Sequence, residues 1–386
     1  MNRRRFLERA GRLGAVALAA APGAPAAAPA GPPAHSPSAE ERQIRVGAIT
    51  EPGGQHLSYF MRSLGTCRGV EAVALADRSG EYFEKGRELL GPRSRSYRTF
   101  ADYREMLAVV KPDLVVLALE PVNTPPIIDT ALRAGCHVLA EKPPCARLED
   151  FEPLAALARD RKRHLMVALA NRMLPPAAKA RELVDSGYLG KLYGASLHLV
   201  ADQTRLKNPA YRQSWPASRK RAGGGKLIYH GIHYLDLIQY VAHDRVRRVS
   251  GFTGNVGGQP IEVEDAAVLA LEFRSGMVGT FNAGYYLDRG YHNRATLWGS
   301  DGWLRLDLGT ERPLEWHSTL PDAPKGVQQF SDPKSDDVYT GMLQSAIDGA
   351  RGTAPPVITT RQSLSVLKVV FAVYQAAATG RSQTIA

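Results

Sequence analysis

The chain has 386 residues, of which 44% are hydrophobic and 23% charged, a composition typical of a globular protein rather than a disordered or fibrous one. Its formal net charge of +11 first suggests an acidic partner, but the basic residues are scattered, without zinc-finger spacing, an aromatic RNA-binding block or a basic helix, so nucleic-acid binding is not expected. The three cysteines form no disulfide framework, no cluster has metal-ligand spacing, and no apolar stretch reaches the roughly 20 residues of a membrane span.

The N-terminus has the features of an export signal. The run 3–7 (Arg-Arg-Arg-Phe-Leu) is similar to the twin-arginine consensus, a mildly apolar stretch covers 13–21, and Ala28-Pro29-Ala30 offers a cleavage site. A disordered, arginine-rich N-terminus is the alternative. We expect residues 1–37 to be a twin-arginine signal peptide and an unstructured Ala/Pro linker. The twin-arginine export machinery would then carry the folded chain to the periplasm or the outside.

From residue 44 the chain alternates short apolar runs with amphipathic segments, which is the pattern of βαβ units. The run 114–117 (Leu-Val-Val-Leu) is apolar on both faces, as in a buried parallel strand. We expect strands at 44–49, 70–76, 114–119 and 137–140, and helices at 57–64, 82–90, 103–109 and 127–134. Right-handed crossovers then predict a doubly wound α/β domain over 42–165, with its ligand crevice at the carboxyl ends of the strands.

The turn after the first expected strand is rich in glycine but is not a clean Gly-x-Gly-x-x-Gly. Gly53 and Gly54 would let backbone N–H groups approach a pyrophosphate at a helix N-terminus. Glu51 is a poor neighbour for that anion, and Pro52 lacks an N–H. This turn alone is weak evidence for a dinucleotide site.

Asp77 and Arg78 end the second expected strand, where the cofactor would present its ribose. An acidic side chain at this point typically binds the ribose hydroxyls, which predicts a cofactor-binding role for Asp77. Ordinary strand-end turn chemistry is an equal alternative. Arg78 could instead meet a 2′-phosphate, so the pattern leaves both NAD and NADP open.

From residue 191 the pattern changes to alternating strands separated by tight turns such as 274–276 and 300–302. Strands are expected at 192–200, 247–253, 266–273, 277–283, 294–298 and 302–306, and helices at 338–349 and 362–378. Residues 166–386 are therefore predicted to form a second α/β domain with a mostly antiparallel open sheet.

Several separated motifs point to one family. The stretch 134–144 (Ala-Gly-Cys-His-Val-Leu-Ala-Glu-Lys-Pro-Pro) is similar to an Ala-Gly-x-x-Val-x-x-Glu-Lys-Pro element, and Thr124-Pro125-Pro126 to a loop under a nicotinamide. Residues 223–236 run from Gly-Gly-Gly to Gly-Ile-His-Tyr-Leu-Asp, and 374–381 form a helix with a Gly-Arg turn. Over residues 43–386 the chain resembles the Gfo/Idh/MocA family, the glucose–fructose oxidoreductase/inositol dehydrogenase superfamily.

The resemblance implies an NAD(P)-dependent oxidoreductase that transfers hydride between a bound dinucleotide and a sugar or polyol hydroxyl. It also implies a homo-oligomer formed through the C-terminal sheet. Thr124, Pro125, Glu141 and Lys142 would then line the cofactor site. Two other functions stay open, an exported NAD-dependent glycoside hydrolase without net redox change and a non-catalytic sugar-binding protein.

The resemblance also makes Lys142 a catalytic candidate. A lysine partly desolvated at a carboxyl strand end can hydrogen-bond a substrate hydroxyl and lower its pKa as hydride leaves the carbon. The alternative is a surface ion pair between Glu141 and Lys142.

A helix expected to begin near Lys226 carries Tyr229, His233 and Asp236 on one polar stripe. His233 matches the family's histidine that donates or accepts a proton beside the substrate, and a core histidine is the alternative. The family often has aspartate at the position of Tyr229, so this phenol is either an acid/base group itself or the mark of a changed or lost reaction.

Four residues are candidate substrate contacts, namely Arg172, Trp215, His230 and Asp236. The loop 203–222 sets aromatic side chains beside cations, which suits a sugar, a sugar acid or a phosphorylated ligand. A solvated basic loop is the alternative.

Overall fold

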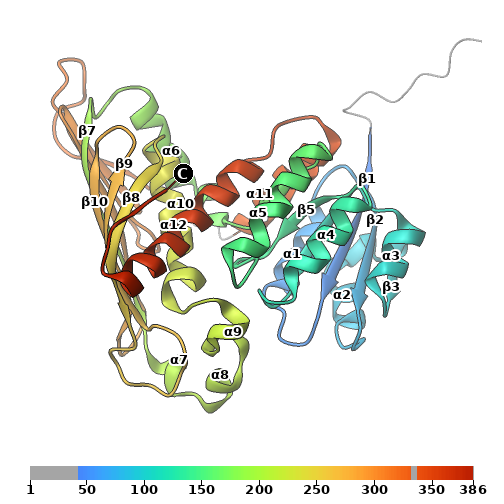
Figure 1. The fold of residues 1–386 in the computed structure, drawn as a ribbon. Coiled ribbons are helices and arrows are strands. Elements are labelled where there is room, and N and C mark those ends of the chain that lie inside the picture. Colours follow the sequence, from blue (N-terminus) through green and yellow to red (C-terminus); the bar gives the residue numbers. More distant parts are fainter. Residues whose placement is uncertain (1–41, 332–336, 386) are drawn as a thin grey trace, which may run out of the picture. The chain divides into compact units, whose positions relative to one another are not determined.

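The computed structural model describes residues 42–331 and 337–385. The predicted signal peptide and linker at 1–37 lie outside the described residues, and the boundary predicted near residue 165 stays a prediction. Two sheets organise the described chain, one of six strands and one of nine (Figure 1).

The first sheet is parallel throughout and has the strand order β3-β2-β1-β4-β5-β6. This order is that of a doubly wound dinucleotide-binding sheet, so the predicted fold class is confirmed. The strands are β1 (Ile44–Thr50), β2 (Val70–Asp77), β3 (Tyr97–Phe100), β4 (Leu114–Ala118), β5 (His137–Ala140) and β6 (Leu165–Val167). The pattern had not predicted β3 and β6, because strands of four and three residues are too short to show a period.

Helical segments connect these strands: α1 (Leu57–Thr66), α2 (Phe83–Leu90), the 3₁₀ turn η1 (Gly91–Ser96), α3 (Tyr103–Val110), α4 (Thr124–Arg133) and α5 (Leu148–Asp160). The prediction had placed the start of α4 later and had missed α5, which contains Pro153. Each crossover returns the chain to the same end of the sheet, so that every strand runs in the same direction. The carboxyl ends of β1, β2, β4 and β5 therefore share one side of the sheet.

The second sheet has the order β14-β13-β12-β11-β7-β10-β9-β8-β15, and all its pairs except β7 with β10 are antiparallel. The predicted mostly antiparallel sheet is thus confirmed. Its strands are β7 (Leu192–Asp202), β8 (Val246–Gly254), β9 (Ala266–Phe273), β10 (Val278–Leu287), β11 (Tyr291–Gly299), β12 (Gly302–Asp307), β13 (Leu314–Ser318), β14 (Gln328–Phe330) and β15 (Gln383–Thr384).

The remaining helical segments are η2 (Ala170–Met173), α6 (Pro175–Asp185), α7 (Thr204–Lys207), α8 (Pro209–Gln213), η3 (Trp215–Ala217), α9 (Arg219–Ala222), η4 (Leu227–Gly231), α10 (Ile232–Val241), α11 (Val338–Arg351) and α12 (Thr360–Thr379). Helices α10 and α12 cover one face of the second sheet, where they contact β7 and β8 (Figure 1). Helix α11 contacts β1, β4 and β5 instead, so a C-terminal segment helps to cover the first sheet.

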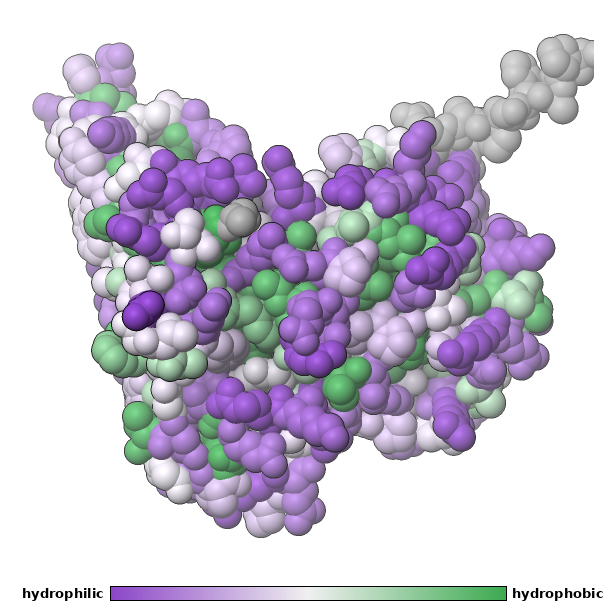
Figure 2. All heavy atoms as spheres, viewed as in Figure 1, coloured by the Kyte–Doolittle hydropathy of each residue, from purple (hydrophilic) through white to green (hydrophobic). Residues whose placement is uncertain are grey.

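On the face drawn in Figure 2, hydrophilic residues predominate and hydrophobic ones occur in scattered patches. Within the described residues, no helix combines the length and apolar character needed to cross a membrane. The apolar residues are instead buried between the sheets and their helices in one large cluster.

Candidate functional site

A cavity of about 490 Å³ lies at the carboxyl ends of the parallel strands. Its walls include Ile49 and Thr50 at the end of β1, Arg78 just after β2, and Leu119 after β4. Arg104, whose guanidinium stacks on Tyr103, adds a second cation. The carboxylate residues Glu51 and Asp102 line the same cavity, so its walls combine apolar side chains with charges of both signs. The position is the crevice where doubly wound sheets bind ligands.

The two glycines of the turn after β1 meet different structural needs, and their contact with a pyrophosphate stays a prediction. Gly53 has φ +85°, a left-handed conformation that favours glycine. A Cβ on Gly54 would lie 2.1 Å from the carbonyl oxygen of Ala118, so this position is glycine because β4 passes so close. Helix α1 follows with no side chain capping its N-terminus, which leaves backbone donors available for an anion.

The carboxylate of Glu51, expected to disturb a bound pyrophosphate, has partners of its own. It accepts hydrogen bonds from the backbone N–H of Glu120 at 2.8 Å and from the side-chain amide of Asn123. These bonds fix the Glu51 carboxylate near the start of α4, and the donors partly offset its negative charge.

Asp77 is buried and forms the strand-end turn that was the alternative to a ribose contact. Its carboxylate accepts from the backbone N–H and hydroxyl of Ser79 and from the backbone N–H of Tyr82. Asp77 does not line the cavity, whereas Arg78 does. The ribose role of Asp77 therefore stays a prediction. Of the two residues, only Arg78 faces the cavity in which a cofactor would lie.

The predicted loop at Thr124 and Pro125 is already helical, because α4 begins at Thr124. The Thr124 hydroxyl donates to the backbone oxygen of Glu120 at 2.9 Å, and Pro125 occupies the first turn, where its missing N–H costs nothing. Pro125 lines a separate cavity of about 520 Å³ with Arg147 and Lys220. Their predicted cofactor contacts are not tested by this geometry.

Lys142 follows β5 and is buried with its ammonium facing the second domain. Its Nζ donates to the backbone oxygen of Tyr229 at 3.2 Å and lies 4.5 Å from the centre of the Tyr229 ring. The nearest carboxylate oxygen of Glu141 is 4.0 Å away. Burial lowers the pKa of Lys142, while Glu141 opposes the shift and Arg205 adds to it. The exposed ion pair that was the alternative is thus excluded, because both side chains are buried.

Sequence reasoning missed His56. This residue precedes α1 with φ +64°, and its Nδ1 lies 3.0 Å from Oε1 of Glu141. Glu141 thereby stands between the imidazole and the ammonium of Lys142, while its Oε2 is buried and has no hydrogen-bond partner among the described residues. A histidine just before a helix at a glycine turn was the only available signal, and nothing local linked it to Glu141.

Tyr229 lies in η4, a π-helical turn in which the N–H of Ile232 reaches the oxygen of Leu227. Because a π-helical turn is wider than an α-helical one, the side chains of Tyr229 and His233 do not lie on the single straight stripe that a regular helix predicts. The Tyr229 hydroxyl donates to Oε1 of Gln55 at 2.6 Å. Burial is the largest cause that raises its pKa to about 12, so the phenol remains protonated near neutral pH.

His233 is enclosed, and its Nδ1 has no hydrogen-bond partner within the described residues. Burial is the main cause that lowers its pKa well below the ordinary value, and the charges of Lys142 and His56 lower it further. The imidazole is therefore neutral and electrostatically coupled to Lys142. An unpaired buried nitrogen is costly in a purely structural histidine, which favours a functional role.

Trp215 and His230 pack around Tyr229. The Trp215 ring lies 5.7 Å from the Tyr229 ring, and its indole N–H donates to the oxygen of Gly53. The His230 ring lies 4.4 Å from the Tyr229 ring, and its Nδ1 is 3.2 Å from the hydroxyl of Tyr285. The structure thus brings both residues together with Lys142, as predicted for substrate contacts, although no substrate contact itself is tested.

Arg172 and Asp236 do not join this group. The Arg172 guanidinium makes two hydrogen bonds of 2.7 and 2.6 Å to the Asp236 carboxylate and a third, of 3.0 Å, to the backbone oxygen of Val357. Both side chains are buried. These bonds satisfy most of the hydrogen-bonding capacity of the two side chains, which gives the pair a structural role. Both residues also line a cavity of about 370 Å³, and their substrate contacts stay a prediction.

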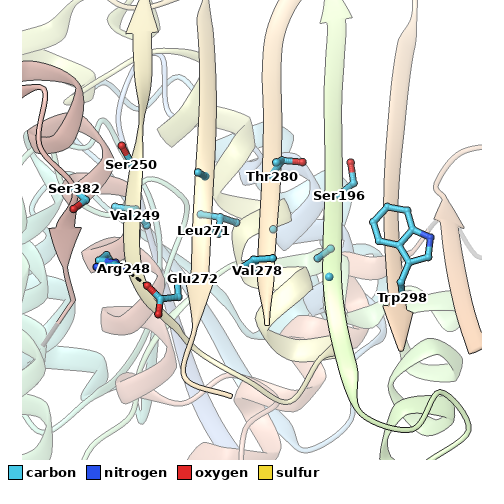
Figure 3. A pocket seen from close by; sticks show the side chains of 14 residues that line it. Ser196, Arg248, Val249, Ser250, Leu271, Glu272, Val278, Thr280, Trp298 and Ser382 are labelled. Carbon is cyan, nitrogen blue, oxygen red and sulfur yellow. Dashed lines mark ion pairs between the residues drawn. The ribbon is translucent and has the colours of Figure 1, made fainter. Parts of the chain in front are cut away.

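Two further observations concern metal binding and a second, separate cavity. Within residues 42–331 and 337–385, no group of three or more His, Cys, Asp or Glu side chains could hold a metal ion. A cavity of about 1010 Å³ lies elsewhere, on the outer face of the second sheet, where Val249, Leu271, Val278 and Trp298 line it across neighbouring strands (Figure 3).

Comparison with known proteins identifies the family. The family model "Oxidoreductase family, NAD-binding Rossmann fold" matches residues 46–169, and "GFO/IDH/MocA C-terminal domain" matches residues 177–305. The chain belongs to the Gfo/Idh/MocA family. It is an NAD(P)-dependent oxidoreductase whose first domain is the NAD-binding domain of that family.

Curated relatives and solved structures are similar over most of their length. The 1,5-anhydro-D-fructose reductase of Ensifer adhaerens is 26% identical over 89% of this chain and 95% of its own. The myo-inositol 2-dehydrogenase of Thermotoga maritima is 22% identical over 78% and 86%. The WlbA dehydrogenase of Bordetella pertussis, solved with NADH and UDP-GlcNAcA, has a TM-score of 0.75 at 22% identity, covering 90% of this chain and 99% of that one. A levoglucosan dehydrogenase solved with NADH and L-sorbose has a TM-score of 0.78 at 16% identity, covering 89% and 99%.

Proposed function

We propose that the protein transfers a hydride between a tightly bound nicotinamide dinucleotide and a hydroxyl-bearing carbon of a sugar or polyol. The observation that carries this proposal is the buried Lys142 ammonium, which meets the second domain at the backbone oxygen of Tyr229. The same domain holds a buried imidazole, His233, whose Nδ1 has no partner in the described chain and whose pKa the charge of Lys142 helps to lower, after burial as the main cause. The named sugar and polyol substrates of the relatives support the substrate class.

The residues of the first domain fit a dinucleotide. The cavity at the strand ends carries Arg78 and Arg104, the N-terminus of α1 is uncapped, and Glu51 is held by its own hydrogen bonds. The bound nicotinamide would supply or accept the hydride. Arg78 in the cavity wall supports a phosphate contact there and is compatible with either NAD or NADP.

The proton is handled by the side chains that the second domain brings to the end of β5. The Lys142 ammonium would donate to the substrate oxygen and stabilise negative charge on it as the hydroxyl proton leaves. His233 is neutral, so its unpartnered Nδ1 can accept that proton. Tyr229 is a positioning residue, since its backbone oxygen and ring hold the ammonium. A phenol with a pKa of about 12 is a poor proton acceptor near neutral pH.

The test is to purify the full chain, identify any released dinucleotide by mass spectrometry, and follow NADH or NADPH absorbance with a panel of sugars and polyols. We expect bound dinucleotide and turnover that Lys142→Met abolishes. Cleavage of chromogenic glycosides without net NADH formation would identify the glycoside hydrolase instead. Sugar binding without any dinucleotide would identify the non-catalytic binder.

We also propose export through the twin-arginine route, which the sequence of residues 1–37 supports. Replacing the arginine pair Arg3-Arg4, which precedes the variable residue and the Phe-Leu of the consensus, by Lys-Lys should retain the protein in the cytoplasm of a host that has the twin-arginine machinery. Periplasmic accumulation of this variant at the wild-type level would overturn the proposal.

The outer face of the second sheet supports a homo-oligomer. Val278 and Trp298 are 58% and 44% exposed on this face, beside the cavity shown in Figure 3. Polar and charged residues, among them Ser196, Arg248 and Glu272, line the same cavity. Large apolar side chains exposed among polar ones are typical of a protein interface, and a second copy offers the same face in return. Light scattering should show a mass above that of one chain, and Val278→Asp with Trp298→Asp should reduce it to the monomer.

A further inference from the structure

A buried lysine with no counterion lies next to the candidate active site. Lys226 precedes η4 and is 0% exposed, yet its Nζ has no hydrogen-bond partner within the described residues. The ammonium lies 4.2 Å from the centre of the Tyr285 ring. An aromatic face stabilises a cation only in part, so a buried ammonium left in this state is costly to the fold.

Arg205, on α7, is a second cation at the same ring. Its guanidinium lies 5.4 Å from the centre of the Tyr285 ring, and its Nη2 donates to the hydroxyl of Tyr291 at 2.7 Å. It forms no salt bridge with a carboxylate in the part of the chain that the structure describes. Two basic side chains thus share one aromatic surface, and neither forms a salt bridge with a carboxylate among the described residues.

Glu264, whose backbone oxygen accepts from the N–H of Lys226, has a buried carboxylate, but that carboxylate does not serve as the partner of the ammonium. Glu264 accepts hydrogen bonds from the backbone N–H groups of Gly225 and Leu227 and from the hydroxyl of Tyr374. Its oxygens therefore hold the start of η4 and leave Lys226 unpaired.

The two cations are connected to Lys142 by a continuous series of contacts. Tyr285 contacts His230, His230 packs on Tyr229, and the Tyr229 ring lies beneath the Lys142 ammonium. The charges of Lys226, Lys142 and Arg205 all lower the pKa of His230, after burial as the main cause. This imidazole is therefore neutral and adds no third charge, although it can still bond a hydroxyl.

We propose that Lys226 and Arg205 bind an anionic group on the substrate, so that the substrate is a sugar carrying a carboxylate or a phosphate. This inference rests on the proposed function, because it places the anion on the molecule whose hydroxyl meets Lys142. The phenols of Tyr285 and Tyr291 would border the sugar ring. An anion would give the buried ammonium the partner that it lacks, and Arg205 could bind two of its oxygens at once.

The experiment uses the full chain with its bound dinucleotide and measures binding by thermal shift and by calorimetry. The probes are D-glucuronate, D-galacturonate, D-gluconate and D-glucose 6-phosphate, with D-glucose, D-galactose and sorbitol as neutral counterparts and inorganic phosphate alone as a control. We expect at least one anionic sugar to bind on the order of tenfold or more tightly than its neutral counterpart, since hydrogen bonds to charged groups are the strong ones. If no anionic probe exceeds its counterpart, or inorganic phosphate alone reproduces the effect, the proposal is wrong.

The variants Lys226→Met and Arg205→Gln test whether these two residues bind the anionic group. Each should remove the preference for the anionic sugar, while binding of neutral sugars stays within about twofold. Lys207→Gln is the matched control, because Lys207 lies on the same short helix and is exposed. Retention of the full preference in both variants would overturn the assignment.

The melting temperature without ligand separates binding from folding. Lys226→Met should melt at a higher temperature than wild type, because it removes an unpaired buried charge. A merely structural lysine would show the opposite. Absence of any change in NADH or NADPH absorbance with every probe would count against the proposed hydride transfer to sugars of this kind, whereas selective binding of anionic sugars would still support the anion site.

Discussion

The indole N–H of Trp215 donates a hydrogen bond to the carbonyl oxygen of Gly53, with 3.1 Å between the two atoms. The tryptophan belongs to the segment after α8, and Gly53 lies in the turn between β1 and α1, 162 positions away. The same ring packs edge-on against Tyr229. The turn proposed to receive the dinucleotide is therefore held by a residue that also packs beside the proposed substrate site.

Trp215→Phe removes this bond and keeps most of the ring. We expect the variant to lose bound dinucleotide faster, by on the order of fivefold, because one hydrogen bond contributes about 1 kcal/mol. The measurement is the fraction of dinucleotide that survives dialysis. Trp303→Phe is the control, since Trp303 lies on β12 of the second sheet and is only partly buried. Equal retention in both variants would show that the bond does not hold the turn.

Lys142→Met tests the proton step. The substitution keeps the buried chain length and removes the ammonium that donates to the backbone oxygen of Tyr229. Turnover should fall by on the order of a hundredfold or more, with dinucleotide binding little changed. The exposed Lys191 gives the control variant Lys191→Met, which should turn over as wild type does. Loss of dinucleotide from Lys142→Met would mean that this lysine serves the cofactor site instead.

His233→Asn should lower turnover to a similar extent, because the unpartnered Nδ1 is the proposed proton acceptor. The double variant with Lys142→Met should be little worse than either single variant, since both groups act on one proton transfer. Single-turnover kinetics on the three variants measures this directly. If the loss of turnover in the double variant equalled the product of the two single losses, Lys142 and His233 would act in separate steps.

The elements that the sequence predicted well are those with a strong period. The apolar runs at β1, β2 and β4 and the alternating strand β9 were placed within a residue of their bounds. Lys142 was predicted because the stretch 134–144 resembles the family's Glu-Lys-Pro element, and the structure places it two residues after the buried strand β5, at a carboxyl strand end. Local patterns suffice where one element decides the position of a side chain.

The contacts that the sequence could not predict join distant elements. Glu141 meets His56 across 85 positions, and Arg172 meets Asp236 across 64. The π-helical turn at η4 could not be predicted either, because the sequence shows only a regular helical period there. One wider turn changes the direction of the side chains that follow it. These features depend on tertiary packing, which a single sequence does not specify locally.

Arg172→Leu separates the structural role of the buried pair from a role in substrate binding. The variant leaves the Asp236 carboxylate buried without its partner, which typically costs about 3–5 kcal/mol of unfolding free energy. Adding Asp236→Leu should recover much of this loss, because two apolar side chains then replace the pair. Denaturant unfolding of the three variants measures both effects. A stable Arg172→Leu protein with a raised KM would instead favour the predicted substrate contact.

The stability gained by Lys226→Met should depend on pH. Burial, reinforced by the charge of Arg205, lowers the pKa of Lys226 from 10.5 to about 7. Between these values the unfolded chain binds more protons than the folded one, so stability rises with pH through this window, and the full cost of the ammonium is present below it. The gain in melting temperature should therefore be largest below about pH 7 and shrink towards zero near pH 10.

The comparison needs melting curves of wild type and variant at about pH 6 and about pH 10, in the absence of any sugar. Lys325→Met is the matched control, because this exposed lysine keeps its solvent contact in the fold and its removal should shift neither curve. A gain of equal size at both values would mean that Lys226 keeps its charge throughout. The ammonium would then already have a negative partner in the folded protein, and the need for an anionic substrate would disappear with it.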